Sequence, residues 1–570
     1  MTPPRALFVI TIAVLMSACT HQEAASSLSL PPAPAEADAR QDLVREQVEK
    51  NRMHHERMAV MATPAASTMA GGMVTGMAMQ DAWQPVPENR EKYAGISDNP
   101  VRRASAEPVS TFSLDVDTGS YSNVRRFLSQ GQLPPRDAVR VEELLNYFPY
   151  DYPAPKDAHP FALTTELAAA PWNAERWLLR VGVKAVEVKA AAMPAANLVF
   201  LVDVSGSMDS PDKLPLVQAT LQQLVNQLRP QDRVAMVVYA GRTAVELEST
   251  AGNHKEKIRA AIARLQAGGS TAGESAIRLA YQQARAGFIK GGINRILLAT
   301  DGDFNVGITD MQQIKDMVAR EREGGISLTT LGFGQGNYQE ALMEQIADVG
   351  NGNYSYIDSL EEGRKVLVEE LSSTFNTVAA DVKLQMEFNP DVISEWRLIG
   401  YENRVLREED FRNDKVDAAE VGAGKSVTAL YELTPVGKKG LLEPRRYDQA
   451  AKPATPGKAG EIGFLRVRYK QPGQTRAVEF DRAVSLRELR ATPGNDFRFA
   501  AAVAGFGQLL RGGNYLGSFG YDDVKELALA GCGADKGGYR QAFVKLVDIA
   551  QSLTPVEPDH GAHTPAQPKE

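Results

Sequence analysis

Three short motifs carry the side chains of this sequence that are best suited to chemistry: DVSGSM (203–208), GGSTAGES (268–275) and TDGD (300–303). They contribute two carboxylates and three hydroxyls, from Asp203, Ser205, Ser207, Thr271 and Asp301. All five donors are oxygen atoms, and hard divalent cations such as Mg²⁺ and Ca²⁺ prefer oxygen ligands. Neutral hydroxyls fill coordination positions without cancelling the charge of the ion. These residue types therefore predict a metal site whose ion stays electrophilic toward a further ligand.

The elements around the motifs predict that the motifs meet in space. Apolar runs without alternation recur at 197–204, 233–240, 294–300 and 326–334, and amphipathic helical stretches separate them. Continuous apolar strands alternating with helices indicate a mostly parallel sheet with helices on both faces. The alternating segment 244–250 is predicted to add an antiparallel edge strand. Because ligands bind at the carboxyl ends of parallel strands, the three motifs are expected at one edge of this sheet.

In this order and on these elements, DVSGSM, GGST and TDG resemble the metal-ion-dependent adhesion site of von Willebrand factor A (VWA) domains. The resemblance covers residues 196–377 and implies a Rossmann-like fold. It implies that the three hydroxyls bind the metal and that Asp203 and Asp301 bind it directly or through water. The expected ion is Mg²⁺, with Ca²⁺ and Mn²⁺ as alternatives. The expected partner is a protein whose Asp or Glu carboxylate completes the ligand shell, a bond that in some family members shifts the last helix.

The flanks of this region resemble those of bacterial envelope VWA proteins. FSLDVDTGSYSNVRRFL (112–128) is similar to their N-terminal segment, and ELRATPGNDFRFAAAVAGFGQLLR (488–511) is similar to their C-terminal one. With both flanks, the resemblance extends over most of residues 95–552.

Alternating hydrophobic patterns on both sides of the VWA region predict half-buried antiparallel strands. They occur at 161–168, 176–188, 383–388, 394–402, 426–433 and 463–470. We expect the later strands to pair with those at 161–188, which gives a β-sandwich with the α/β VWA domain inserted in it. Apolar spacing over 496–512 and 521–552 predicts a helical C-terminal region.

The predicted domain organisation adds the chain ends to these elements. It comprises a signal peptide (1–18), a flexible tether (19–95), a small mixed N-terminal domain (96–160), a β-rich domain (161–195 and 378–482), the VWA domain (196–377), a helical C-terminal domain (483–555) and a tail (556–570).

The first residues, MTPPRALFVITIAVLMSAC, are typical of a bacterial export signal. Arg5 precedes an 11-residue run, Ala6–Met16, that is apolar except for Thr11 and too short to span a bilayer as a helix. Small residues then precede Cys19, and the segment resembles a lipobox, which implies that Cys19 is acylated. An ordinary secretory signal cleaved nearby is the alternative. By resemblance, Thr20 favours the outer membrane of a Gram-negative cell, so we expect a lipid-anchored protein of the cell envelope that faces the periplasm.

Composition and the lack of known catalytic motifs exclude several classes of function. A formal net charge of −8 over 570 residues argues against a nucleic-acid partner, and two cysteines exclude a disulfide scaffold and a cysteine-based zinc site. No GxSxG, HExxH or CxxC motif occurs, and among the seven histidines only His159 and His254 fall in the predicted folded part. We therefore predict no catalytic residue and no enzyme activity. The competing hypotheses are a metal-assisted envelope hydrolase or accessory enzyme and a scaffold with a purely structural metal.

Overall fold

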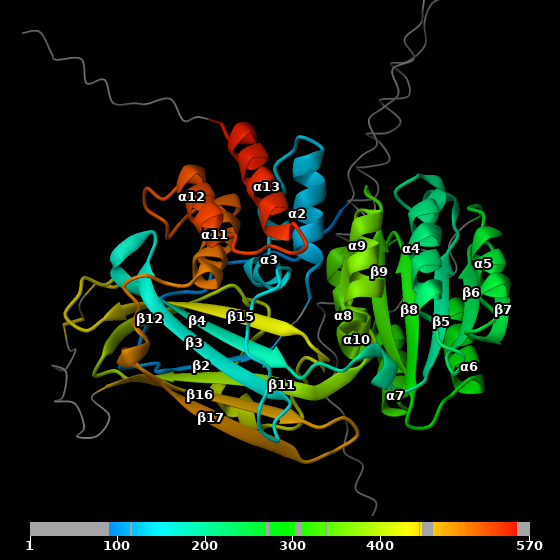
Figure 1. Cartoon of the computed structure of the whole chain (residues 1–570), viewed down its shortest axis with the longest axis horizontal. Helices are drawn as coiled ribbons and strands as arrows, with labels where there is room; N and C mark the ends of the chain where they lie inside the picture. The colour runs from blue at the N-terminus through cyan, green and yellow to red at the C-terminus, as the bar shows by residue number, and fades with distance from the viewer. Residues whose placement is uncertain are drawn as a thin grey trace, which may run out of the picture. The chain divides into compact units, whose positions relative to one another are not determined.

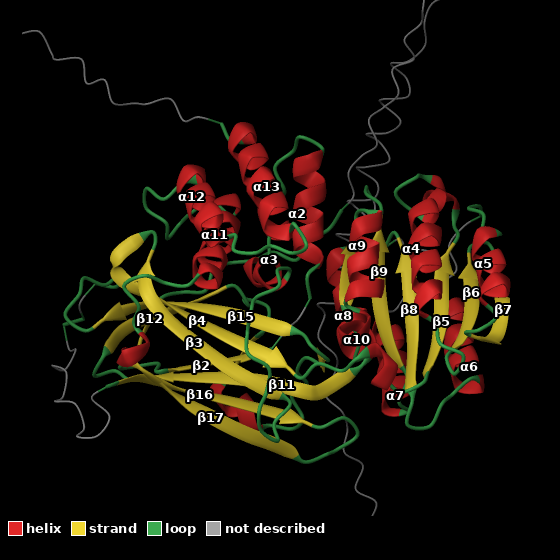
Figure 2. Cartoon of the chain, in the orientation of Figure 1, coloured by secondary structure: helices red, strands yellow, loops and turns green. Residues whose placement is uncertain are grey.

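The strands and helices of the chain are arranged around two β-sheet systems, drawn in Figures 1 and 2. The computed structural model describes residues 91–114, 117–269, 273–302, 311–336, 339–443, 445–446 and 460–555. All of them lie in one compact unit, Val86–Glu570. Cys19, the predicted signal and tether and the tail lie outside the described residues. Among the described helices, none is both long and apolar enough to cross a membrane.

The first system is a six-stranded sheet in the order β10-β9-β8-β5-β6-β7. All neighbouring strands are parallel except β7, which runs antiparallel to β6 at the edge, as the alternation of 244–250 predicts. The strands are β5 (Ala196–Asp203), β6 (Arg233–Tyr239), β7 (Thr243–Ala251), β8 (Ile293–Thr300), β9 (Ser327–Phe333) and β10 (Tyr354–Ile357).

Helices cover both faces of this sheet, which explains why its strands are apolar without alternation. Along β5, Leu198, Phe200 and Val202 belong to one hydrophobic core and Val199 and Leu201 to another. The first core is completed by α4 (Leu214–Gln227), α5 (Lys255–Ala263) and the segment α9 (Leu360–Arg364) to α10 (Leu371–Phe375). The second is completed by α6 (Gly273–Ala286), α7 (Met311–Glu323) and α8 (Glu340–Val349). This is the Rossmann-like VWA fold.

The second system is a β-sandwich of two antiparallel sheets that enclose a shared core. One sheet has the order β1-β12-β15-β4-β3, with strands β1 (Arg102–Arg103), β12 (Ile393–Ile399), β15 (Ser426–Pro435), β4 (Asn173–Ala185) and β3 (Phe161–Ala170). The other has the order β13-β2-β11-β16-β17, with β14 beside β11; its strands are β13 (Val405–Leu406), β2 (Val109–Ser113), β11 (Thr377–Phe388), β16 (Glu461–Lys470), β17 (Ala477–Ser485) and β14 (Val421–Gly422).

The strand partners differ in part from those predicted. β15 pairs with β4, as expected for the strand at 426–433. β11 and β16, however, pair with each other, and β11 also pairs with β2, so neither lies beside the strands at 161–188. Alternation shows that one face of a strand is buried but does not identify its neighbour in the sheet.

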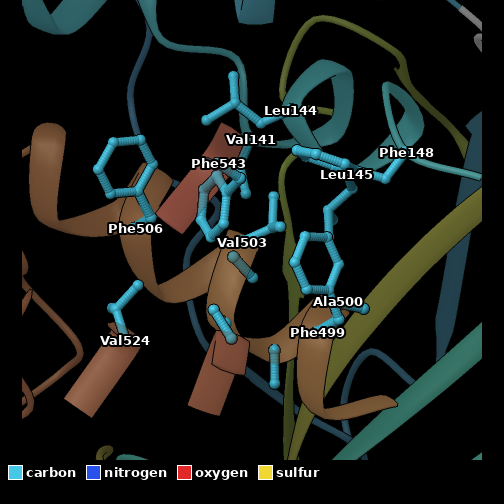
Figure 3. Packing of buried hydrophobic residues seen from close by; sticks show 14 of the residues in the cluster. Val141, Leu144, Leu145, Phe148, Phe499, Ala500, Val503, Phe506, Val524 and Phe543 are labelled. Carbon is cyan, nitrogen blue, oxygen red and sulfur yellow. The ribbon is translucent and has the colours of Figure 1, made fainter. Parts of the chain in front are cut away.

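The segment 96–160, predicted as a small domain of its own, is shared among larger structures. Its strands β1 and β2 extend the two sandwich sheets. Its helices α2 (Gly119–Ser129) and α3 (Val141–Asn146) lie in one hydrophobic core with α11 (Asn495–Leu510), α12 (Tyr521–Gly531) and α13 (Tyr539–Leu553). Figure 3 shows Phe148, which follows α3, close to Phe499 of α11 and Phe543 of α13. The centre of the Phe148 ring lies 4.9 Å from that of Phe499 and 5.5 Å from that of Phe543. A segment of this length buries too little by itself and gains its core from the C-terminal helices.

Candidate metal centre

Asp203 is the last residue of β5 and is completely buried. Its Oδ1 accepts a hydrogen bond from the backbone N–H of Ser205 (2.9 Å), and its Oδ2 accepts one from the hydroxyl of Thr300 (3.1 Å). Thr300 ends β8, which is the parallel neighbour of β5. The carboxyl ends of the two strands therefore bring the DVSGSM and TDGD motifs together, as the sheet topology requires.

Burial raises the pKa of Asp203 to about 6, because a carboxylate loses its hydration inside the protein. The hydrogen bonds from Ser205 and Thr300 oppose this change, whereas the negative charge of Asp301 adds to it. Two effects therefore disfavour the ionised form of Asp203: its burial and the negative charge of Asp301. A bound cation would reduce both.

Ser205 and Ser207 present their hydroxyls side by side in the turn after β5, with 3.0 Å between the two Oγ atoms. A short 3₁₀ turn over Gly206–Asp209 forms this arrangement, and Met208, which is fully buried, fixes the turn against the core. The two hydroxyls are hydrogen-bonded to each other at this distance, and two neighbouring oxygen ligands of one octahedral ion would have a similar separation.

The loop that leads to Thr271 is hydrogen-bonded to the DVSGSM turn. The N–H of Gly268 donates to the carbonyl of Val204 (2.8 Å), and the N–H of Gly206 donates to the carbonyl of Gly269 (3.0 Å). Gly269 has a φ of +85°, and a Cβ on it would lie 2.8 Å from the backbone nitrogen of Gly241, so a side chain is not accommodated there. Thr271 itself lies outside the described residues.

Asp301 is 1% exposed and forms an ion pair that the motif does not reveal: the Nζ of Lys213 lies 3.0 Å from its Oδ2. Lys213 and Thr300 are the two residues of the site that sequence reasoning missed. Thr300 stands directly before the predicted ligand, and Lys213 stands at the start of a helix, where a lysine is unfavourable beside the positive end of the helix dipole.

A fourth loop, at the end of β9, closes over the Lys213 side chain. A Cβ on Gly334, whose φ is +72°, would lie 2.3 Å from the Cε of Lys213. The carbonyl of Gly334 accepts from the hydroxyl of Tyr356 (2.6 Å), and the N–H of Gly336 donates to Glu91 (2.9 Å). The beginning of the described chain is thus attached to the same edge of the sheet as the candidate ligands.

The donor set fits a hard divalent ion. Across the described residues, no group of three or more His, Cys, Asp and Glu side chains is placed to hold a metal. The candidate site has only two carboxylates, and its remaining donors are hydroxyls, which is the combination expected for Mg²⁺ with several water ligands. Four of the five predicted ligands are described: Asp203 is the last residue of β5, and Ser205, Ser207 and Asp301 lie in the segments that follow β5 and β8.

Neither histidine of the described chain lies at this edge. His159 contacts the sandwich: its Nδ1 lies 3.1 Å from the hydroxyl of Tyr469, and its ring stacks on Phe480. His254 follows β7, whose last residue, Ala251, pairs with Arg233 at the opposite end of the sheet. Cys532 directly follows α12 and packs against the core that the C-terminal helices form, and burial raises the pKa of its thiol.

Comparisons with known proteins agree with this architecture. Residues 197–370 match the von Willebrand factor type A domain family, residues 87–180 match a second family, described as von Willebrand factor, and residues 373–553 match the family described as "Uncharacterized protein YfbK, C-terminal". The chain is 51% identical over 475 residues to YfbK of Escherichia coli (strain K12), covering 82% of each protein. The chain belongs to the YfbK family.

More distant relatives match a smaller part of this chain. The protein sll0103 of Synechocystis is 28% identical over 34% of this chain and 45% of its own length. Among solved structures, a von Willebrand factor type A protein from Catenulispora acidiphila is 16% identical, with a TM-score of 0.40 over 70% of this chain and 91% of that one. The mussel protein PTMP1, solved with zinc in its metal-ion-dependent adhesion site (MIDAS) motif, is 20% identical. Its TM-score is 0.26, over 33% of this chain and 46% of that one.

Replacing Asp203 by Asn is expected to stabilise the metal-free protein. A carboxyl group whose pKa is raised on folding destabilises the fold once it ionises, so the difference from wild type is small at pH 4 and complete above about pH 7. Two pKa units correspond to at most about 3 kcal/mol, and we expect a gain of about 1–3 kcal/mol. Urea unfolding of both proteins in EDTA at pH 4 and pH 7.5 measures the difference in their free energies of unfolding. An Asp203→Asn protein that is less stable than wild type at pH 7.5 would contradict this account of the site.

Proposed function

We propose that this protein is a lipid-anchored component of the cell envelope whose VWA domain binds a divalent ion and captures an acidic side chain of a partner protein. The VWA domain itself indicates a role in protein–protein interaction or assembly. The observation that carries the finer proposal is the pair of buried carboxylates, Asp203 and Asp301, beside two adjacent serine hydroxyls at the carboxyl end of the sheet.

Asp203, Ser205, Ser207, Thr271 and Asp301 are the residues that would hold the ion. When bound, the ion supplies a Lewis-acidic position that a carboxylate oxygen can occupy. The protein's own contribution is to orient the donors: Ser205 N–H and the Thr300 hydroxyl fix the two oxygens of Asp203. Mg²⁺ is the proposed ion, with Ca²⁺ and Mn²⁺ as alternatives.

The burial and the hydrogen-bond partners of Asp203 and Asp301 favour a role in binding an ion over a role in hydrolysis. A general base must reach the proton it removes, directly or through one water. Asp203 is fully buried and both of its oxygens already accept hydrogen bonds, and Asp301 is paired with Lys213. In the described part of the edge, these carboxylates are positioned to hold an ion rather than to exchange protons with a substrate. Hydrolysis and a purely structural metal are the alternative outcomes of the experiments below.

Mg²⁺ is expected to stabilise the full-length protein, because a ligand that binds only the folded state adds about 2.7 kcal/mol at one hundred times its Kd. Asp203→Ala and Asp301→Ala should remove this effect. Differential scanning calorimetry with Mg²⁺ or EDTA measures it. Asp232→Ala is the matched control: Asp232 is also buried, but it precedes β6 at the other end of the sheet, so its variant should keep the response. An equal response in wild type and both ligand variants would exclude the proposed site.

Partner capture should require the metal. We expect the immobilised wild-type protein to retain an envelope protein from extract in Mg²⁺ and to release it in EDTA. The immobilised Asp203→Ala variant should not retain that protein. Mass spectrometry of the three eluates identifies the partner. A partner retained equally in all three conditions would show that capture does not pass through the metal site.

Cys19 is the proposed lipid attachment site, with the protein on the outer membrane facing the periplasm. Metabolic labelling with a palmitate analogue should label wild type, and Cys19→Ser should lose the label and leave the membrane fraction. Cys532→Ser is the control and should keep both, because Cys532 is a half-buried free thiol at the end of α12. Release of an unlabelled wild-type protein into the soluble periplasm would support an ordinary secretory signal instead.

A further inference from the structure

Lys213 is a buried cation placed directly on one of the candidate metal ligands. Its Nζ lies 3.0 Å from Asp301 Oδ2, in hydrogen-bonding geometry, and its side chain is only 8% exposed. An ammonium group in this position competes electrostatically with a divalent ion for the same carboxylate. Its presence therefore needs an explanation beyond general stability.

The helix that Lys213 precedes does not explain its position. Lys213 is the N-cap residue of α4, and its side chain makes no capping hydrogen bond. Cations are disfavoured at helix N-termini, where the backbone dipoles already present positive charge, and residues with a side-chain oxygen are preferred there. The local sequence is thus unfavourable for the helix, which indicates that the ammonium group has its role elsewhere.

The loop after β9 holds the Lys213 side chain in place. Gly334 follows β9 directly, and a Cβ there would lie 2.3 Å from both Cγ and Cε of Lys213. The absence of a side chain at this position leaves room for the lysine stem between α4 and β9. The ammonium group is therefore held on Asp301 by two loops, one before α4 and one after β9.

We propose that Lys213 sets the charge of the metal-loaded site, so that the site binds its ion less tightly but attracts a partner's carboxylate more strongly. Asp203, Asp301 and Lys213 together carry a charge of −1 when both carboxyls are ionised, and a divalent ion changes it to +1. Without Lys213, the charges of Asp203, Asp301 and the ion would sum to zero. A positive site in a poorly solvated position attracts an anionic side chain, and a neutral one does so far less. This inference rests on the proposed metal-dependent function.

Titration of the full-length protein with Mg²⁺ by isothermal calorimetry tests the first half of the proposal. Lys213→Met keeps the length of the stem and removes the charge, and we expect it to bind Mg²⁺ at least about tenfold more tightly. A nearby cation lowers the affinity of a carboxylate for a proton by about one to three decades, and the same repulsion acts on a divalent ion. Lys213→Arg keeps the charge and should stay near the wild-type affinity. An affinity of Lys213→Met equal to or lower than that of wild type would overturn the proposal.

Lys365→Met is the matched control. Lys365 is also buried, with a side chain 4% exposed, and it pairs with Glu370 at 2.7 Å in the same domain but away from the candidate ligands. Its loss should lower stability and leave Mg²⁺ affinity unchanged. Equal tightening in this variant would show a general effect of net charge and would count against a specific role of Lys213.

Acetate tests the second half. With Mn²⁺ bound, a carboxylate that reaches the ion broadens the methyl proton resonance of acetate, and the concentration dependence gives its affinity. We expect weaker acetate binding to Lys213→Met than to wild type, opposite in direction to the change in metal affinity. Unchanged or tighter acetate binding would overturn this half. Absence of metal binding in wild type itself, or its persistence in Asp203→Ala, would instead refute the proposed function.

Discussion

Two carboxylates buried at the carboxyl end of a parallel sheet require positive charge, and much of the local structure satisfies this requirement. An uncompensated buried charge is costly, so Asp301 pairs with Lys213, while Asp203 accepts two hydrogen bonds and has a raised pKa. The sheet topology creates the problem, because β5 and β8 are parallel neighbours that end at the same edge. The ammonium group of Lys213 lies on Asp301, and the proposed divalent ion would bring further positive charge to both carboxylates.

The regions that flank the VWA domain restrain its helices through partly buried ion pairs whose acidic partners are buried. Arg125 of α2 donates to Asp358 (2.7 Å) and to Glu362 of α9 (2.8 Å), and the hydroxyl of Tyr147 also donates to Glu362 (2.8 Å). Arg404, from the sandwich, pairs with Glu344 of α8. Such pairs add little net stability, but breaking them leaves a buried charge without a partner. Because Arg125 contacts α9 and Arg404 contacts α8, displacement of either helix relative to the flanks would break these pairs.

The sequence predicts the parallel sheet and its carboxyl edge, which depend on local order, and does not predict the contacts that join distant segments. Apolar runs, turns and helix starts lie within a few residues of each other, so the parallel sheet and the edge that carries Asp203, Ser205 and Asp301 follow from the pattern. The pairing of β2 with β11 joins segments far apart in the chain, and alternation carries no information about it. The role of Lys213 is not predicted for the same reason: its side chain reaches Asp301, which follows β8, through space that Gly334 leaves open.

A continuous set of contacts joins the candidate metal site to the N-terminal flank. Lys213 packs against Gly334, whose carbonyl accepts from Tyr356, and the guanidinium of Arg126 lies 5.7 Å from the centre of the Tyr356 ring. Arg126 also pairs with Glu91, and Glu91 accepts from the N–H of Gly336, which returns to the same loop. Because packed side chains resist independent displacement, the position of the ammonium group on Asp301 depends on residues outside the VWA domain. The domain and its flank therefore form one structural unit at the edge where the partner is proposed to bind.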